Sequence, residues 1–284
     1  VNFADTLMVK GTYQEKPALP FAPGIEVCGI VEALGPGVAG PAPGRRVAAM
    51  CGHGGFAEVV TARTETCVAL PGEIGDAEAA ALQVAYGTSD LALAHRAGLK
   101  AGERLLVLGA AGGVGLTAVE LGALMGAEVI AVARGAERLA TARAMGARHL
   151  IDGEHEDIRK RTKALGGADV VYDPVGGEQW VAAMRAANPE ARLIPIGFAS
   201  GEVPQIPANI LMVKNLTVIG LYWGAYYRFA PEVLGESLRR LLDWHAAGRI
   251  RPVISHEVPL GEANAALELL RRREATGKVV LVMR

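Results

Sequence analysis

The most chemically informative stretch of this sequence is a cluster of glycines, Ala-Ala-Gly-Gly-Val-Gly, at residues 110–115. Four consecutive apolar residues, Leu105–Leu108, precede it and predict a buried parallel strand. Small and apolar residues follow from Leu116 to Met125 and predict a helix. A helix that begins at a glycine turn presents unpaired backbone N–H groups and the positive end of its dipole. The turn therefore predicts an anion-binding site.

The glycines of this turn have distinct expected roles in binding a pyrophosphate. Gly112 and Gly113 would let the pyrophosphate approach the backbone, and Gly115 would let the helix pack closely against the strand. A second predicted strand, Glu128–Ala133, follows at the distance usual for a dinucleotide-binding unit. The residues expected to contact the dinucleotide are Ala111, Gly112, Gly113, Val114 and Gly115. The alternative is a tight structural turn that binds no ligand.

Basic residues at the end of the second strand indicate which dinucleotide is bound. An NAD enzyme usually has an acidic residue about 20 positions after the glycines, where it holds the ribose hydroxyls. Here the strand is followed by Arg134, with Arg138 one helical turn later. Because a guanidinium group matches the geometry of a phosphate, this pair predicts binding of the 2′-phosphate and hence NADPH. The alternative is that Arg138 belongs to a solvated helix face.

Alternating strands and helices surround the glycine turn from Leu105 onward and predict a doubly wound parallel sheet with right-handed crossovers. The predicted strands are Leu105–Leu108, Glu128–Ala133, His149–Ile151, Asp169–Asp173, Arg192–Gly197 and Leu216–Leu221. The predicted helices lie near Val114–Met125, Glu137–Met145, Asp157–Leu165 and Glu178–Ala187.

The flanking segments lack this alternation. On the N-terminal side, short strands are predicted at Ile25–Leu34, Val47–Met50, Gly55–Ala62 and Cys67–Leu70, followed by helices at Ala77–Leu82 and Tyr86–Ala97. On the C-terminal side we predict helices at Pro231–Ala247 and Leu260–Arg273 and strands at Val253–Val258 and Lys278–Val282. We therefore expect a dinucleotide-binding domain at residues 86–221, inserted into a barrel-like substrate domain formed by residues 1–85 and 222–284. The substrate cleft would lie between them.

Composition excludes several classes of function. The chain has 284 residues, of which 51% are hydrophobic, and its formal net charge is −1, so neither a nucleic acid nor an anionic membrane is the expected main partner. No apolar run reaches the length of a membrane span, and no signal peptide is recognised, which makes a cytoplasmic location the expectation. The three cysteines, Cys28, Cys51 and Cys67, form no metal-binding pair in sequence and are expected to act as small hydrophobic residues.

Six motifs distributed in order along the whole chain give it a specific resemblance. They are Val1–Asp5, Pro23–Gly29, Ala110–Gly115, Tyr172–Gly177, Ile196–Gly201 and Thr276–Val280. On these residues the chain resembles the medium-chain dehydrogenase/reductase superfamily, and within it the zinc-independent NADPH:quinone oxidoreductase branch that includes zeta-crystallin. The resemblance implies a Rossmann domain inserted in a GroES-like partial β-barrel domain.

The same resemblance implies roles for individual residues. Asn2 and Tyr13 would lie near the nicotinamide and the acceptor as catalytic residues, although Tyr13 could instead anchor its proline-rich loop. Thr88 would touch the nicotinamide side of the cofactor, or else cap a helix. Further cofactor contacts are implied for Val175, Gly197 and Phe198. One departure is Gly153, because many relatives have a tyrosine there that packs on the cofactor phosphate.

Residue types at the family's zinc positions predict that no metal is bound. The zinc-dependent alcohol dehydrogenases of the superfamily place two cysteines and a histidine at positions that here are Asn2, Ile25 and Val84. None of these is a good zinc ligand, and the cysteine-rich structural zinc lobe is absent from the sequence. Without a Lewis acid, reduction of an electron-poor acceptor is favoured over oxidation of an alcohol.

The resulting functional prediction is zinc-independent, NADPH-dependent reduction of quinones or related α,β-unsaturated carbonyls by hydride transfer. Two alternatives remain at this point. One is an enoyl-thioester reductase, and the other is an NADPH-binding structural or RNA-associated protein without turnover.

Two further expectations concern the start of the chain and its assembly. Relatives in the resembled family have several strands before the Val1–Asp5 motif, so we expect either a fragment or a substrate domain with an open edge. The apolar strand Leu216–Leu221 at the end of the sheet, followed by aromatic residues, predicts a homodimer formed by edge pairing.

Overall fold

The computed structural model describes residues 1–72 and 74–283. The chain forms two compact units, one made of Val1–Ala85 and Leu238–Arg284 and the other of Tyr86–Ser237. The second unit extends beyond the predicted boundary at residue 221 because the following segment packs within it. The indole of Trp223 lies so close to Gly87 that a Cβ there would come within 2.8 Å of Trp223 Nε1. The Ser237 hydroxyl donates to the buried Asp90 carboxylate at 2.5 Å.

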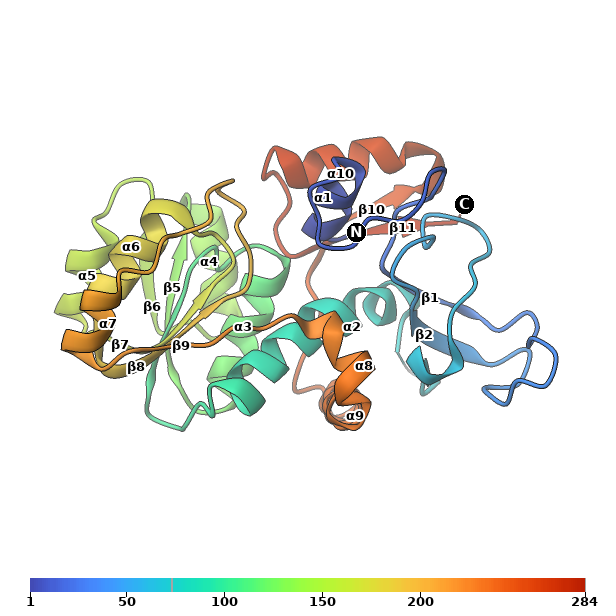
Figure 1. Ribbon diagram of the computed structural model, residues 1–284, viewed down its shortest axis with the longest axis horizontal. Coiled ribbons are helices and arrows are strands. Elements are labelled where there is room, and N and C mark those ends of the chain that lie inside the picture. The colour runs from blue at the N-terminus through green and yellow to red at the C-terminus, as the bar shows by residue number, and fades with distance from the viewer. Residues whose placement is uncertain (73, 284) are drawn as a thin grey trace. The chain divides into compact units, whose positions relative to one another are not determined.

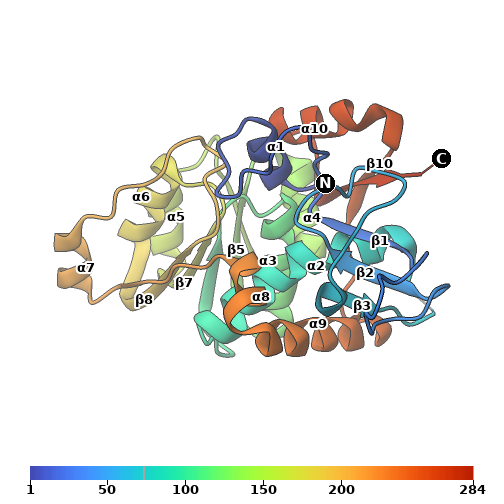
Figure 2. The same ribbon diagram turned by 45° about the vertical axis from the view of Figure 1, so that its right-hand side comes forward.

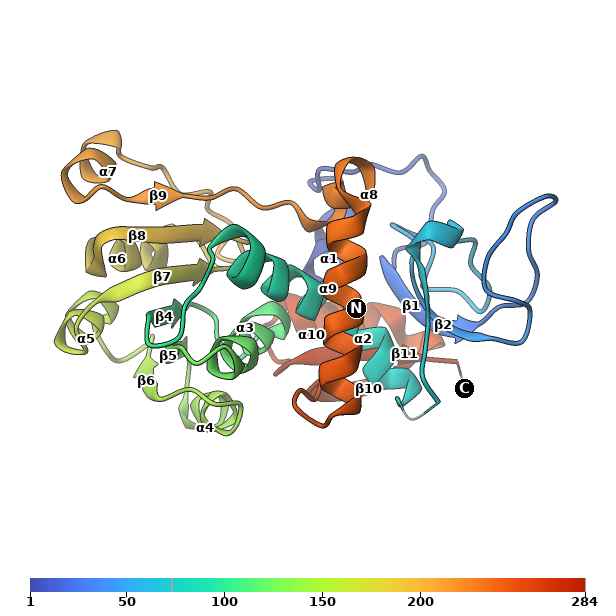
Figure 3. The same cartoon turned by 90° about the horizontal axis from the view of Figure 1, so that it is seen from below.

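The Tyr86–Ser237 unit is built on a six-stranded sheet in the order β6-β5-β4-β7-β8-β9, in which all neighbouring strands are parallel (Figures 1 and 3). The strands are β4 (Arg104–Val107), β5 (Glu128–Ala133), β6 (His149–Asp152), β7 (Ala168–Asp173), β8 (Ala187–Pro195) and β9 (Thr217–Val218). This is the strand order of a doubly wound Rossmann sheet, and the predicted fold class is confirmed.

Helices cover both faces of this sheet. In Figure 1, α3 and α4 lie on one side of the strands and α5 and α6 on the other, and α5 packs against α6. The helices are α3 (Gly113–Leu124), α4 (Ala136–Ala144), α5 (Ile158–Ala164), α6 (Gly177–Ala186) and α7 (Ala208–Lys214). Because both faces are covered, most positions of the central strands are apolar, and Leu105, Leu106 and Val107 of β4 are fully buried. The sequence pattern that predicted β4 therefore reflects its position in the middle of the sheet.

The other unit contains two small sheets. One is antiparallel, in the order β1-β2-β3, and the other is the parallel pair β10-β11; Figure 2 shows the three antiparallel strands side by side. The strands are β1 (Glu26–Ile30), β2 (Arg46–Met50), β3 (Cys67–Ala69), β10 (Ile254–Pro259) and β11 (Lys278–Val282). Helix α1 (Phe3–Val9) packs against α10 (Ala263–Arg271).

The remaining elements are helical. Helices α2 (Asp76–Asp90) and α9 (Pro231–Ala246) each contain a boundary between the two units. The shorter elements are α8 (Tyr226–Phe229), the 3₁₀ turns η1 (Thr64–Thr66), η3 (Trp223–Ala225) and η4 (Leu260–Glu262), and the π-helical segment η2 (Leu91–Arg96).

Four predicted elements, two strands and two helices, were wrong in kind or extent. The segment Gly55–Ala62 is not a strand, and at its start the N–H groups of Gly54, Gly55 and Phe56 bond to the carbonyls of residues 22–24, in a loop distant in sequence. The two helices predicted at 77–82 and 86–97 are one helix, α2, continued by η2, since the intervening residues are buried and helix-compatible. The predicted edge strand Leu216–Leu221 is reduced to β9, which pairs with β8 only at Thr217 and Val218.

Candidate functional site

The strand order of the parallel sheet predicts where a ligand binds. The connections from β4 and β7 lead in opposite directions across the sheet, so these neighbouring strands mark its topological switch point. In open α/β sheets, ligands bind beyond the carboxyl ends of the strands at such a point. Here β4 is followed by the glycine turn and β7 by the loop from Asp173 to Gly177. These two loops are the candidate dinucleotide site.

The glycine turn shows which glycines the fold itself requires. A Cβ on Gly115 would lie 2.1 Å from the Gly109 carbonyl oxygen, so only glycine allows α3 to pack this closely. Gly109, which the sequence analysis did not single out, has φ +55 and faces Val175. Gly112 differs, because it has φ −77 and a Cβ there would meet nothing closer than 3.4 Å. The protein alone therefore does not require glycine at 112, which suits approach by a ligand.

Gly112 is also the N-cap of α3, and no side chain caps the first turn of that helix. The first turn contains Gly113, Val114 and Gly115, whose N–H groups have no acceptor in the preceding helical turn. An exposed N-cap glycine and uncapped amides at the positive end of a helix dipole form a cradle for a phosphate. The predicted contact residues from Ala111 to Gly115 are thus brought together, and they fit a pyrophosphate.

A buried hydroxyl network ties α2 to this turn. Thr88, a predicted cofactor residue, lies in α2 and is buried. Its neighbour Ser89 bonds to the Val114 carbonyl at 3.0 Å, to the Thr117 hydroxyl at 2.8 Å and to the Tyr172 hydroxyl at 2.9 Å. Sequence reasoning missed Ser89, although a polar residue on an otherwise apolar helix face was the available indication. The network places Thr88 on the helix that contacts the start of α3.

Asp173 organises the loop on the other side of the switch point. Its side chain is fully buried, and its carboxylate accepts the N–H of Val175 at 2.7 Å and that of Gly176 at 2.9 Å. Burial raises the pKa of Asp173 to about 6, against the opposing effect of the hydrogen bonds from Gly176 and Val175. The loop lies against the glycine turn, since a Cβ on Gly109 would come within 2.9 Å of Val175 Cγ2.

The segment that contains Gly197 and Phe198 is bonded to the same loop. The N–H of Ile196 donates to the Asp173 carbonyl at 2.7 Å, and the N–H of Ser200 donates to the Val175 carbonyl at 2.9 Å. Gly197 is partly buried, whereas the Phe198 side chain is 37% exposed. The predicted cofactor residues after β7 and after β8 therefore lie in two loops joined by backbone hydrogen bonds.

The end of β5 places Arg134 beside an acidic partner. The Arg134 guanidinium lies 3.6 Å from the Glu154 carboxylate, and the two side chains are 35% and 48% exposed. The N–H of Gly153 donates to the Ala133 carbonyl at 2.9 Å, which holds the ends of β5 and β6 together. Arg138 lies on the first turns of α4 and is half-buried. A 2′-phosphate bound by Arg134 would compete with Glu154, a partner that the sequence analysis did not foresee.

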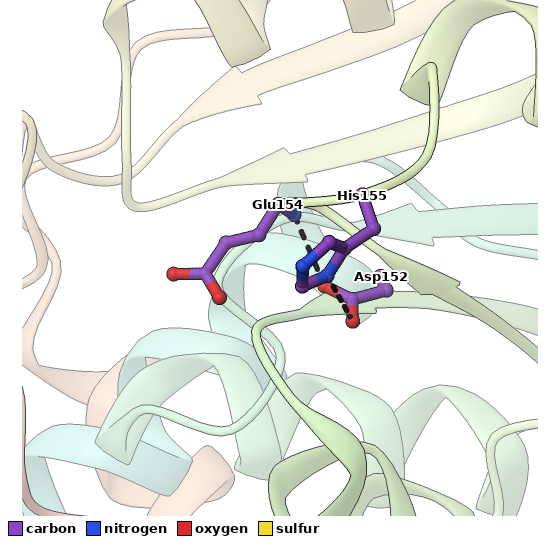
Figure 4. A group of neighbouring side chains, drawn as sticks. All are labelled: Asp152, Glu154 and His155. Carbon is purple, nitrogen blue, oxygen red and sulfur yellow. Dashed lines mark hydrogen bonds and ion pairs between the residues drawn. The ribbon is translucent and has the colours of Figure 1, made fainter.

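The loop after β6 also contains a cluster of potential ligand groups (Figure 4). Asp152 accepts the Glu154 N–H at 3.0 Å and bonds to His155 Nδ1 at 3.0 Å, and the hydrogen bond to Asp152 raises the pKa of His155. One ligand atom from each of Asp152, Glu154 and His155 lies within 4.8 Å of the others. Glu154 and His155 are exposed, and Asp152 already accepts two hydrogen bonds, so the geometry is that of a surface loop.

The other unit contains Asn2 in a buried polar network. Lys278 Nζ donates to the Asn2 Oδ1 at 2.7 Å and to the Glu26 carboxylate at 2.8 Å, while Asn2 Nδ2 donates to the same carboxylate at 2.9 Å. The second carboxylate oxygen of Glu26 accepts the Val84 N–H at 2.8 Å. Asn2, Ile25 and Val84, the residues predicted to stand at the zinc positions of the family, therefore adjoin or belong to a network that contains the Glu26–Lys278 ion pair.

Burial makes this ion pair a fixed feature of the unit. The Glu26 and Lys278 side chains are only 1% and 5% exposed. Burial acts to raise the pKa of Glu26, but the charge and hydrogen bond of Lys278 outweigh it, and the pKa of Glu26 is lowered. Since Lys278 has only donors and ionised Glu26 only acceptors, the orientation of the Asn2 amide is determined.

Tyr13, the second predicted catalytic residue, lies in the loop after α1 and is half-buried. The loop begins with the N–H of Gly11 donating to the Met8 carbonyl at 3.0 Å. The catalytic roles of Tyr13 and Asn2 stay predictions.

Comparison with known proteins decides the family. Residues 1–72 match the alcohol dehydrogenase GroES-like domain, and residues 113–239 match the zinc-binding dehydrogenase model. The quinone oxidoreductase-like protein 2 homolog of Nematostella vectensis is 41% identical over 287 residues, which cover 99% of this chain and 78% of that protein. The chain belongs to the medium-chain dehydrogenase/reductase family, in its quinone oxidoreductase branch.

Solved structures of this branch agree in fold. The Escherichia coli quinone oxidoreductase complexed with NADPH has a TM-score of 0.93 and 30% identity, with 100% of this chain and 88% of that chain covered. The quinone oxidoreductase from Thermus thermophilus, also described in complex with NADPH, has a TM-score of 0.87 and 36% identity over 100% of this chain and 88% of that one. The predicted family resemblance is confirmed.

Proposed function

We propose that this protein is an NADPH-dependent oxidoreductase that reduces quinones or related α,β-unsaturated carbonyls without a metal. The proposal rests on the start of α3 at the switch point of the sheet, which no side chain caps. There the fold itself does not require a glycine at position 112, because a Cβ would meet no atom closer than 3.4 Å. The NADPH complexes of two similar quinone oxidoreductases support the choice of cofactor and the oxidoreductase class.

The residues of this chain would act mainly by binding and orientation. When bound, NADPH supplies a hydride from C4 of its nicotinamide. The turn from Ala111 to Gly115 would bind the pyrophosphate, and Arg134 and Arg138 would bind the 2′-phosphate. Asn2, held by Lys278 and Glu26, would present its amide to the acceptor, and Tyr13 or solvent would supply the proton that completes a two-electron reduction.

A direct assay tests the proposed reaction. Purified protein is mixed with NADPH and a panel of quinones, enones and enoyl-thioesters, and NADPH oxidation is followed with and without exhaustive chelation. We expect oxidation with quinones or enones that chelation does not reduce. Turnover of enoyl-thioesters alone would instead assign the thioester reductase alternative. Binding of NADPH without turnover of any acceptor would assign a non-catalytic binding protein, and loss of activity with removal of one zinc per chain would contradict the metal-free mechanism.

Replacing Gly112 by aspartate should separate folding from cofactor binding. Aspartate is a preferred N-cap residue, and a Cβ at this position meets nothing closer than 3.4 Å, so the thermal midpoint of the cofactor-free protein should stay the same or rise. The new carboxylate would repel the pyrophosphate, and a cost of about 1.4 kcal/mol weakens binding roughly tenfold. Calorimetric titration with NADPH measures the effect. Gly112→Asn is the matched control of equal size without charge. If Gly112→Asp binds NADPH as tightly as the wild type does, the pyrophosphate does not bind at this turn.

We also propose that the protein forms a homodimer through the edge of its parallel sheet. Strand β9 is the edge strand, and the neighbouring helix α7 exposes Met212 and Val213, at 73% and 75%. An edge strand flanked by exposed apolar side chains favours pairing with a second copy. Sedimentation at micromolar concentration should show a dimer, and the double variant Met212→Lys/Val213→Lys should show a monomer. A wild-type monomer would contradict the proposal.

No helix among the described residues is long and apolar enough to cross a membrane. The cytoplasmic location stays a prediction.

A further inference from the structure

The loop after β7 has a single buried acidic group at its base. Asp173 is the last residue of β7 and is fully buried, and its two carboxylate oxygens together accept three hydrogen bonds from the backbone of Val175 and Gly176. Two of these come from the Gly176 N–H, at 2.9 and 3.1 Å, and one comes from the Val175 N–H at 2.7 Å. The carboxylate thus determines the path of the chain as it leaves the sheet.

The path of this loop matters because it lies between two other segments of the candidate site. On one side, Val175 lies against Gly109 of the glycine turn, where a Cβ added to Gly109 would be 2.9 Å from Val175 Cγ2. On the other side, the segment containing Gly197 and Phe198 bonds to Asp173, Pro174 and Val175 through its backbone N–H groups, at 2.7 to 3.3 Å. A shift of the loop would therefore move three of the predicted cofactor residues together.

We propose that Asp173 is a positioning residue for the dinucleotide: its buried carboxylate holds the Val175–Gly176 loop against the glycine turn, so that the loops after β4, β7 and β8 form one binding surface. This inference rests on the proposed function of the glycine turn. Asp173 acts through the backbone of its neighbours and does not itself touch the cofactor. It could not be inferred from the sequence, because an aspartate at the end of a strand is equally consistent with a solvated turn.

Protonation of Asp173 provides a readout that a purely structural side chain would lack. Burial raises its pKa to about 6, and a protonated carboxyl loses acceptor capacity for the two N–H groups. The titratable groups on the adjoining segments include Tyr172, which bonds to Ser89, Glu178 in the first turn of α6, and Glu202, whose carboxylate lies near Gly177. We therefore expect cofactor affinity to fall as the pH decreases through about 6. NADH is the appropriate probe, because a 2′-phosphate has its own pKa near 6.

The experiment compares cofactor binding by wild type, Asp173→Asn and a matched control. Asparagine has the size of aspartate but only one acceptor oxygen. The Asp173→Asn variant should therefore bind NADPH about threefold to tenfold more weakly than the wild type at pH 7.5. The control, Asp169→Asn, lies at the opposite end of the same strand, where its carboxylate accepts the Arg104 N–H at 2.8 Å. It should leave affinity unchanged. Thermal unfolding without cofactor verifies that each variant is folded.

The pH series distinguishes the possible outcomes. Wild type and Asp169→Asn should lose NADH affinity severalfold between pH 7.5 and 5.5, whereas Asp173→Asn should show no such step. Equal affinities and equal pH profiles in wild type and Asp173→Asn would overturn the positioning role while leaving the proposed function intact. Failure of the wild type to bind either NADPH or NADH would overturn the proposed function itself. The wild-type pH profile remains informative if the variant does not fold.

Discussion

Replacing Arg134 and Arg138 together by alanine should weaken NADPH binding by roughly tenfold to a hundredfold and leave NADH binding nearly unchanged. A well-made hydrogen bond to a charged group contributes about 1.5–3 kcal/mol, and about 1.4 kcal/mol corresponds to tenfold in affinity. Arg134 is 35% exposed, so solvent screening reduces its contribution, and Glu154 at 3.6 Å competes with the phosphate for the same guanidinium. The lower half of the range is therefore expected.

The structure supplies a matched control for this experiment. Arg148 pairs with Glu128 at 3.7 Å, and Arg143 donates to the Arg148 carbonyl. Arg143 and Arg148 therefore lie near the amino ends of β5 and β6, whereas Arg134 follows the carboxyl end of β5. The double variant Arg143→Ala/Arg148→Ala should bind NADPH as wild type does. Higher salt should reduce the wild-type preference for NADPH, because screening weakens charge interactions at the surface. Equal use of NADH by the wild type would mean that neither arginine recognises the phosphate.

Removing the charge of Lys278 should have the largest effect on stability. The Lys278→Met variant leaves the Glu26 carboxylate buried without its cation, and breaking a buried ion pair on one side costs about 3–5 kcal/mol. The Asn2 amide also loses its donor. The free energy of unfolding in denaturant measures the loss. The double variant Glu26→Gln/Lys278→Met should recover a large part of it, because no charge then remains buried.

The pH dependence of this effect has a definite sign. The pKa of Glu26 in the folded protein lies below its ordinary value of 4.5, so the stabilisation by the pair is complete above about pH 4.5 and decreases as the pH falls. The stability difference between wild type and Lys278→Met should therefore shrink in acid, where Glu26 becomes neutral. A difference below about 1 kcal/mol at neutral pH, or one that grows in acid, would contradict the role assigned to the pair.

Local patterns in the sequence determined much of the dinucleotide-binding half. Strands β4 and β5 contain continuous apolar segments, Leu105–Val107 and Val129–Ala133, because the sheet is covered on both faces, and that constraint is visible in composition alone. Gly115 was correctly assigned to close packing of helix on strand, since a Cβ there would overlap the Gly109 carbonyl. Such constraints act between residues that are close in sequence, and they can therefore be predicted from the sequence alone.

Boundaries and weak strands were less predictable. The segment Gly55–Ala62 alternates like a strand, but its neighbouring amides bond to a loop that is distant in sequence, and no local pattern reveals such a partner. The edge strand β9 is shorter than predicted, because a strand extends only as far as its neighbour offers hydrogen bonds.

Only the tertiary structure decided how charged and polar side chains combine. Asn2, Glu26 and Lys278 come from opposite ends of the chain, and their network exists because β11 returns beside the N-terminal segment of its unit. Arg134 was assigned to a phosphate from its type and position, whereas its pairing with Glu154 depends on how β5 and β6 align. Asp173 likewise acquires its role from burial at the switch point. Hydrophobic periodicity indicates which face of a helix or strand is buried. The partner of a buried charge depends instead on which segments the fold brings together, because a buried charge that lacks a partner destabilises the protein.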